Sequence, residues 1–339
     1  MPVHKGKNEY KRLEQPISSL QLNLKRPARD PKAIGLIFFV LMLILGFIIL
    51  FSKIRPAVCS NVIMLNTTLI EMDISQIDNI SISVNLLDFE FVVDESLDPT
   101  KFKIVLIEKN VQNPSDMPHL IIERNIEEKL LHIHNIDPEN DRHPCRTAAL
   151  TVHVPSNWDG SGAYKNYIFR NFSIDAVTVS NDGLDIGNWT NTKLGIKYLW
   201  INAEGSTVTG DHIRVAHMRV EGGVSINRIE CVGDSIREIQ IQAYKNDHFI
   251  GNVSRCAVDA STSLGSVVLG VNSEWTGSFD IESVKGLVWI ERFDPYVHLD
   301  SRYIHNSHHK RGYIRKNAVQ NIVIHSGGEG QVTLFRNDF

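Results

Sequence analysis

Several chemical signatures are missing from this 339-residue chain. It has no Walker A loop, no Gly-x-Ser-x-Gly elbow and no His-Glu-x-x-His zinc motif, which argues against nucleotide binding, serine hydrolysis and zinc proteolysis. Helical spacing of apolar residues is almost absent after residue 60. Between Pro155 and Pro295 there is no proline, whereas 15 of the 22 glycines fall there. Because proline removes a ladder donor and glycine admits positive φ, this region favours laddered strands joined by tight turns.

One long hydrophobic run is present, near the N-terminus. Residues 33–52 carry no charge, and a helix of that length spans a hydrocarbon core of about 30 Å. Residues 1–32 hold eight basic and three acidic residues, so the positive-inside rule keeps this tail in the cytosol. We expect a single-pass type II membrane protein with a signal-anchor, in the plasma membrane or a secretory-pathway endomembrane. A signal cleaved before Ser60 is the alternative, but the run exceeds a usual h-region.

Composition divides the chain into five segments. We expect a disordered basic cytosolic tail (1–32), a transmembrane helix (33–52), a juxtamembrane linker (53–60), an N-terminal β region (61–155) and β-solenoid repeats with a polar insertion near 300–316 (156–339). In the tail, Tyr10 and Leu13 match the Tyr-x-x-apolar form of a cytosolic sorting signal. The expected partners on this side are therefore the lipid bilayer and an adaptor protein.

The cysteines and glycosylation sequons all follow the hydrophobic run, on the side expected to be extracellular or lumenal. Disulfide bonds persist there. The chain has four cysteines, which permit three alternative sets of pairs; they are Cys59, Cys145, Cys231 and Cys256. We expect Cys231 to pair with Cys256 because both lie in the repeat-rich region. Asn-x-Ser/Thr sequons predict a glycoprotein, with acceptors at Asn66, Asn79, Asn171, Asn188 and Asn252.

Pairs of apolar residues one position apart recur after Pro155. The pairs are Val177/Val179, Leu199/Ile201, Met218/Val220, Ile239/Ile241, Val267/Leu269 and Leu287/Trp289, at steps of 22, 19, 21, 28 and 20 residues. A weaker series lies between them at Leu184/Ile186, Val224/Ile226 and Phe279/Ile281. Two short strands and two turns per repeat predict a mainly β, single-stranded β-solenoid, with residues 321–335 as its last coil. A β-sandwich is the alternative architecture.

A resemblance to a known family rests on these same repeats. A strand ending in Val-Pro, "LTVHVPSNWD", precedes segments such as "AVTVSNDGLDIGN", "YLWINAEGSTVTG" and "MRVEGGVSINRI". This pattern resembles the putative-adhesin β-solenoid family, most closely from Leu150 to Ile290. The resemblance implies a β-solenoid, often behind a membrane helix, and supplies no catalytic residues. The charged segment from Asp300 to Lys316 departs from the family's pattern.

Candidate chemistry is sparse. The acidic residues beside glycines read as turn residues: Asp182, Asp185, Asp211 and Asp234. Three histidines and a basic residue in the polar insertion are weak ligand-contact candidates: His305, His308, His309 and Arg311. An exposed strand face accounts for His132 and His134. We expect no metal site, no catalytic residue and no cofactor.

The tryptophans give a weak signal for ligand contact. Trp189 and Trp275 stand among polar residues and are the candidates for exposure. Trp200 and Trp289 adjoin apolar positions, and we expect them in the core.

The sequence thus predicts a non-enzymatic, adhesin-like β ectodomain that recognises a carbohydrate or protein ligand. The alternatives are a membrane-tethered polysaccharide-active β-helix enzyme and a structural scaffold. Nucleic-acid binding is not expected, because the residues after the membrane run are acidic overall.

Overall fold

The computed structural model describes residues 63–84, 87–110, 120–135, 147–156, 167–176, 184–189, 195–233, 237–292, 297–315 and 320–337. No helix in these ranges is long and apolar enough to cross a bilayer. The run 33–52, the sorting signal at Tyr10 and Leu13, and Cys59 and Cys145 lie outside the described residues.

The described part of the chain is mainly β, as the sequence predicts. A single 3-10 turn, η1 (Ile74–Gln76), accompanies the strands. The strands are β1 (Ile63–Asp73), β2 (Asn79–Ser83), β3 (Leu87–Asp94), β4 (Lys101–Asn110), β5 (Leu120–Asn125), β6 (Leu130–Asn135), β7 (Thr147–Pro155), β8 (Tyr167–Asp175), β9 (Leu184–Asp185), β10 (Gly195–Cys231), β11 (Glu238–Ala243), β12 (His248–Ser254), β13 (Ala257–Thr262), β14 (Val267–Asn272), β15 (Gly277–Ser283), β16 (Val288–Glu291), β17 (Val297–Leu299), β18 (His309–Ile314), β19 (Gln320–Ser326) and β20 (Val332–Asn337).

Strand pairing forms two ladders, between which the chain alternates. The first ladder runs β5–β6–β2–β8–β10–β11–β13–β19–β15–β18–β17. The second runs β1–β4–β7–β3–β9–β10–β12–β14–β20–β16. The long β10 serves both: residues 195–202 and 217–221 pair in the first ladder, and 208–209 and 224–230 pair in the second.

Alternating side chains build the core. Strand β11, with the sequence EIQIQA, buries its two isoleucines and exposes the residues between them, since successive side chains on a strand point to opposite faces. In the parallel register Ile241 lies beside Val220 on one side and Ala260 on the other. Each large aliphatic side chain buried in this way contributes roughly 1.5–3 kcal/mol. The predicted pairs Leu199/Ile201, Met218/Val220, Ile239/Ile241 and Val267/Leu269 are all buried, whereas Val177/Val179 lies outside the described residues.

Buried hydroxyls and glycines shape the corner where the chain leaves the first ladder for the second. The backbone N–H of Gly265 donates to Thr262 Oγ1 at 3.0 Å, and that of Gly286 donates to Ser283 Oγ at 2.9 Å. These bonds close two tight turns. A Cβ atom on Gly330 would clash with the backbone carbonyl of Gly265 in the neighbouring turn, so only glycine permits this close backbone stacking.

A disulfide joins neighbouring passes of the chain at the opposite corner. Cys231 ends β10 and Cys256 precedes β13, and their Cα atoms lie 5.6 Å apart. The predicted Cys231–Cys256 pairing is confirmed.

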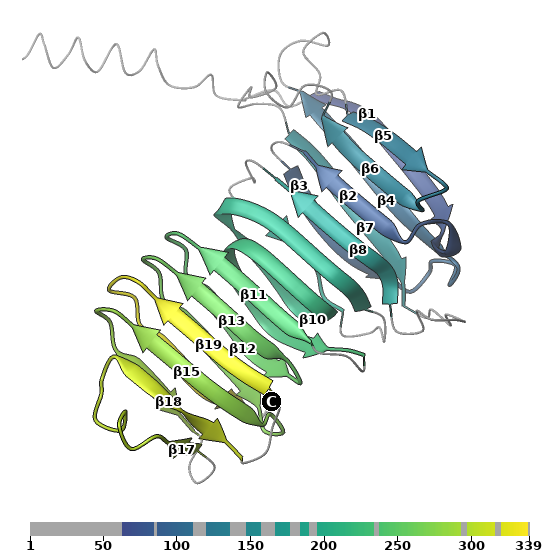
Figure 1. Ribbon diagram of the computed structural model, residues 1–339. Coiled ribbons are helices and arrows are strands. Elements are labelled where there is room, and N and C mark those ends of the chain that lie inside the picture. Colours follow the sequence, from purple (N-terminus) through teal and green to yellow (C-terminus); the bar gives the residue numbers. More distant parts are fainter. Residues whose placement is uncertain are drawn as a thin grey trace, which may run out of the picture. The chain divides into compact units, whose positions relative to one another are not determined.

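The C-terminal strands do not lie where their position in the sequence predicts. In the first ladder β19 lies between β13 and β15, and in the second β20 lies between β14 and β16; Figure 1 shows the yellow β19 between the green β13 and β15. The prediction that residues 321–335 form the last coil is therefore wrong, because these residues lie between strands that precede them in the sequence. The first ladder ends instead with β18, which pairs antiparallel with β15 and lies within the predicted polar insertion, and with the short β17 beyond it.

Candidate functional site

The outer face of the first ladder carries exposed aromatic rings at β10. Tyr198 and Trp200 alternate with the buried Leu199 and Ile201, so both rings point outward, and each residue is 40% exposed. Their parallel neighbours on β8 are Asn171 and Ser173. Two neighbouring exposed rings offer a flat apolar surface, which makes this patch a candidate for ligand contact.

A shallow hollow opens beside these rings. Its volume is about 460 Å³, and its lining comprises Tyr198, Leu199, Trp200, His217, Met218, Arg219, Glu238 and Gln240. The rings of Tyr198 and His217 stack at 4.8 Å between centroids with an interplanar angle of 13°. The Lys197 ammonium lies 5.2 Å from the Tyr198 ring centroid. Rings, a guanidinium, a carboxylate and a carboxamide thus meet in one hollow.

Two pKa shifts describe the electrostatics of this face. Burial lowers the pKa of His217, Glu238 opposes that shift and the charge of Lys197 adds to it. Burial raises the pKa of Asp259, and the negative charge of Glu238 raises it further. The imidazole of His217 is therefore held toward its neutral form, and the carboxyl of Asp259 toward its protonated form.

The polar surface continues onto β11 and β13. A second hollow of about 200 Å³ is bordered by Arg219, Val220, Gln240, Ile241, Gln242, Asp259 and Ser261. The two carboxamides, the Ser261 hydroxyl, the Arg219 guanidinium and the Asp259 carboxyl supply both hydrogen-bond donors and acceptors. Together with flat rings, such groups suit a polyhydroxylated ligand that has both an apolar face and a polar rim.

The tryptophans lie opposite to their predicted positions. Trp189 and Trp275 are 1% and 2% exposed, so neither is available for ligand contact. Their indole N–H groups donate to the backbone carbonyls of Ile186 at 2.9 Å and Cys256 at 3.0 Å. These bonds explain how residues among polar neighbours are buried without an unsatisfied donor.

The other pair of tryptophans, predicted in the core, is exposed. Trp200 is 40% and Trp289 is 47% exposed. A residue that adjoins an inward position on a strand points outward, and in β16 the inward residue is Val288 rather than Leu287. The predicted pair Leu287/Trp289 was therefore out of register by one residue.

The histidines of the polar insertion make separate local contacts rather than one site. His309 Nε2 lies 2.6 Å from Asp280 Oδ1, and His308 Nδ1 lies 2.5 Å from the carbonyl oxygen of Gly286. His305 is exposed on the turn before them, and the Arg311 guanidinium lies 3.9 Å from Asp280 Oδ2. Their role in ligand contact remains a proposal without support from this geometry.

Sequon asparagines occupy different environments. Asn171 and Asn188 are exposed, whereas Asn252 is 4% exposed and leaves no room for a glycan in the fold. Asn79 and Asn171 are neighbours across β2 and β8, and Asn171 Nδ2 donates to Asn79 Oδ1 at 2.5 Å. The side chain of Asn66 lies outside the described residues.

Two of the four acidic residues that were predicted in turns lie beside the same hollow. Asp185 and Asp211 border a hollow of about 550 Å³ on the second ladder, together with Glu90. Asp185 accepts a hydrogen bond from the backbone N–H of Gly187 at 2.9 Å, and Asp211 accepts from the carboxamides of Asn188 at 2.7 Å and Asn227 at 3.0 Å. Both carboxylates thus have structural partners; Asp182 and Asp234 lie outside the described residues.

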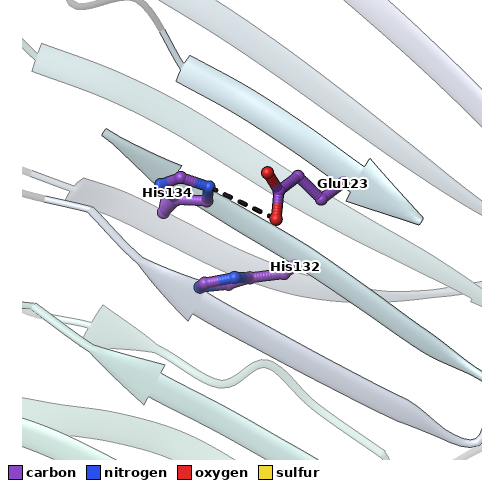
Figure 2. A group of neighbouring side chains, drawn as sticks. All are labelled: Glu123, His132 and His134. Carbon is purple, nitrogen blue, oxygen red and sulfur yellow. Dashed lines mark ion pairs between the residues drawn. The ribbon is translucent and has the colours of Figure 1, made fainter. Parts of the chain in front are cut away.

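A cluster that the sequence did not predict lies on β5 and β6. Figure 2 shows His132 and His134 projecting from one strand toward Glu123 on its neighbour. The two histidines alternate on β6, and the antiparallel register places Glu123 opposite His132. Glu123 was missed because strand pairing, rather than sequence spacing, brings it to the histidines.

Comparisons with known proteins add only distant similarities. No family model and no curated protein matches the chain. A putative cell adhesion protein from Clostridium sporogenes is 8% identical with a TM-score of 0.34, covering 80% of this chain and 99% of that one. A putative adhesin from Parabacteroides distasonis is 11% identical with a TM-score of 0.28, covering 80% of this chain and 97% of that one. A putative lipid binding protein from the same species is 13% identical with a TM-score of 0.28, covering 79% of this chain and 96% of that one. TM-scores this low carry no argument about function.

Proposed function

We propose that this protein recognises a carbohydrate through the outer face of the first ladder, at β10, β11 and β13. The observation that carries the proposal is Trp200, whose ring is 40% exposed and borders a hollow with Arg219 and Gln240. An exposed indole offers a flat apolar surface to a sugar ring, while the neighbouring polar groups hydrogen-bond its hydroxyls. This is a recognition role, and it requires no bond to be broken.

The proposal includes a β-solenoid architecture for residues 156–339, in the manner of an adhesin, behind the N-terminal β region 61–155. Supporting it are the alternation of the chain between two ladders and the parallel pairing of β10, β11 and β13. Continuous parallel pairing of this kind differs from the antiparallel pairing typical of a β-sandwich. A repeated strand face offers the same kind of surface at successive levels, which suits an extended ligand.

The proposal also includes a type II membrane anchor at residues 33–52, with the β region outside or in a lumen. Its support is the uncharged run and the basic tail that precedes it. The disulfide between Cys231 and Cys256 fits an oxidising compartment, and the exposed Asn171 and Asn188 are available for glycosylation there.

The test uses the full chain in detergent micelles on a glycan panel, with two tryptophan variants. We expect saturable binding that Trp200→Ala weakens at least about tenfold, because a lost aromatic contact of about 1.4 kcal/mol corresponds to that factor. Trp289→Ala is the matched control, since Trp289 is similarly exposed on the second ladder. Equal loss in both variants, or none in Trp200→Ala, would contradict the proposal; capture of a protein instead of a glycan would favour an adhesion partner or scaffold role.

A polysaccharide-active enzyme is the second candidate function, and one observation favours it. Glu238 and Asp259 carry carboxyl groups on the same face, and the charge of Glu238 helps to raise the pKa of Asp259. Two carboxyl groups on one face are the kind of pair that glycosidic cleavage uses. Turnover of a bound glycan that is abolished in both Glu238→Gln and Asp259→Asn would establish this function; binding without turnover would exclude it for that glycan.

A further inference from the structure

Glu123, His132 and His134 form a compact group with metal-ligating chemistry. One potential ligand atom from each residue lies within 4.8 Å of the other two. The Nε2 atom of His134 is 3.8 Å from Glu123 Oε2, the contact dashed in Figure 2. The rings of His132 and His134 stack at 4.5 Å between centroids. It is the only such group of three within the residues that the structure describes.

The backbone holds the three side chains on one face. His132 and His134 alternate on β6 with the buried Leu131 and Ile133, so both point outward. Glu123 faces His132 across the antiparallel β5–β6 pair. In a tetrahedral zinc site, ligand atoms at about 2.0–2.1 Å from the metal lie about 3.3 Å from one another. The present spacing of up to 4.8 Å is wider than that value, so metal binding requires the side chains to rotate inward.

Solvent can reach the group, because His132 and His134 are only half-buried and Glu123 is exposed. A hollow of about 520 Å³ borders the group and is lined by Glu123, Arg124, Asn125, Ile126, Leu130 and His132. The guanidinium of Arg124, which also lines the hollow, donates to Gln76 Oε1 at 2.6 Å.

We propose that Glu123, His132 and His134 bind Zn²⁺ through two imidazole nitrogens and one carboxylate oxygen, with the fourth position open toward the hollow. Two nitrogen donors and a single carboxylate suit a borderline metal such as Zn²⁺ and disfavour Ca²⁺ and Mg²⁺, which require mainly oxygen ligands. An open position admits water or a donor group from a bound molecule. The site is separate from the hollow at Trp200 and stands independently of the proposed recognition function.

Isothermal titration of the metal-free full chain with Zn²⁺, with Mg²⁺ as a negative control, tests the site. We expect one Zn²⁺ per chain, with affinity at least about 100-fold weaker in His132→Ala and His134→Ala and at least about tenfold weaker in Glu123→Gln. His325→Ala is the matched control. His325 and Glu282 form a similar pair on the same ladder, 3.7 Å apart, without a second histidine in the group.

Three results would overturn the proposal. The His132→Ala and His134→Ala variants could retain their affinity for Zn²⁺, the control His325→Ala could lose as much affinity as they do, or the unaltered chain could bind no Zn²⁺. Circular dichroism checks that each variant folds. If a histidine variant does not fold, Co²⁺ substitution in the unaltered chain decides. Strong visible bands of a four-coordinate ion with histidine ligands support the site, and the weak spectrum of the hydrated ion refutes it.

Discussion

The two ladders have similar inner faces and different outer faces. Inward rows in both are isoleucine, leucine and valine, such as Val220 beside Ile241 in the first and Ile250 beside Leu269 in the second. The outer face of the first presents rings and charges around Trp200. The outer face of the second presents Phe249 beside Val268 between β12 and β14. Core packing fixes the inner rows, so the two ladders differ in the outward side chains that packing leaves free to vary.

Replacing tryptophans inside and outside the core should give the largest contrast in stability. Trp275→Ala removes a buried ring and its hydrogen bond to the carbonyl of Cys256, and we expect it to lower the free energy of unfolding by about 3–5 kcal/mol. Trp289→Ala, on the outer face of the second ladder, should change it by less than about 1 kcal/mol. Urea denaturation of the full chain in micelles measures both, and similar losses would contradict the assignment of inner and outer faces.

Removing the disulfide tests the corner that the two ladders share. Cys231 and Cys256 are 25 residues apart in sequence, and a loop of that length constrains the unfolded chain by about 3 kcal/mol. The Cys231→Ala/Cys256→Ala double variant should lose stability of that order in the same denaturation experiment. An unchanged midpoint would show that the bond does not constrain the chain between the ladders.

A glycine pair tests the opposite corner. A Cβ at Gly330 would clash with the backbone carbonyl of Gly265, so Gly330→Ala should destabilise the fold by about 2 kcal/mol. Gly327→Ala is the matched control, because its Cβ would lie 3.1 Å from the nearest atom, the carbonyl oxygen of Ser263. The midpoint of thermal unfolding should be clearly lower for Gly330→Ala than for Gly327→Ala. Equal midpoints would refute close backbone stacking at this corner.

A buried histidine should give the smallest effect, visible as pH dependence. Burial lowers the pKa of His248, against the opposing effects of its bond to Ser261 and the charge of Asp247. In the unfolded state the pKa of this histidine is about 6.5, so the unfolded chain binds more protons than the folded one below that pH. The contribution of His248 to the free energy of unfolding is therefore fully present above about pH 6.5 and is lost as the pH decreases toward the folded pKa. His248→Gln should flatten this slope. An unchanged slope would show that His248 is not the group responsible.

The sequence was sufficient for the disulfide and for the inner faces apart from the pair Leu287/Trp289, which is exposed. Apolar residues two apart predicted the buried pairs at β10, β11 and β14 because period-two alternation directly reflects the pleat of a strand. The pairing of Cys231 with Cys256 followed from their shared region. Local pattern therefore specifies local geometry well.

The order of strands and the candidate sites could not be predicted in this way. Nothing in the sequence of β19 indicates that it lies between β13 and β15, since its apolar pairs suit any level of the ladder. Trp200 was placed in the core because it adjoins the inward Leu199 and Ile201, although alternation along a strand turns the residue between two inward positions outward. Glu123 joins His132 only through strand pairing. Features that depend on contacts between distant segments require the structure.

Hydroxyl-radical footprinting of the full chain, with and without the glycan selected by the panel, tests the central claim most directly. The account predicts that Trp200 and Trp289 are oxidised and Trp189 and Trp275 are not, and that the glycan protects Trp200 alone. Protection of Trp289 instead, or oxidation of Trp189 and Trp275 in the folded protein, would contradict it.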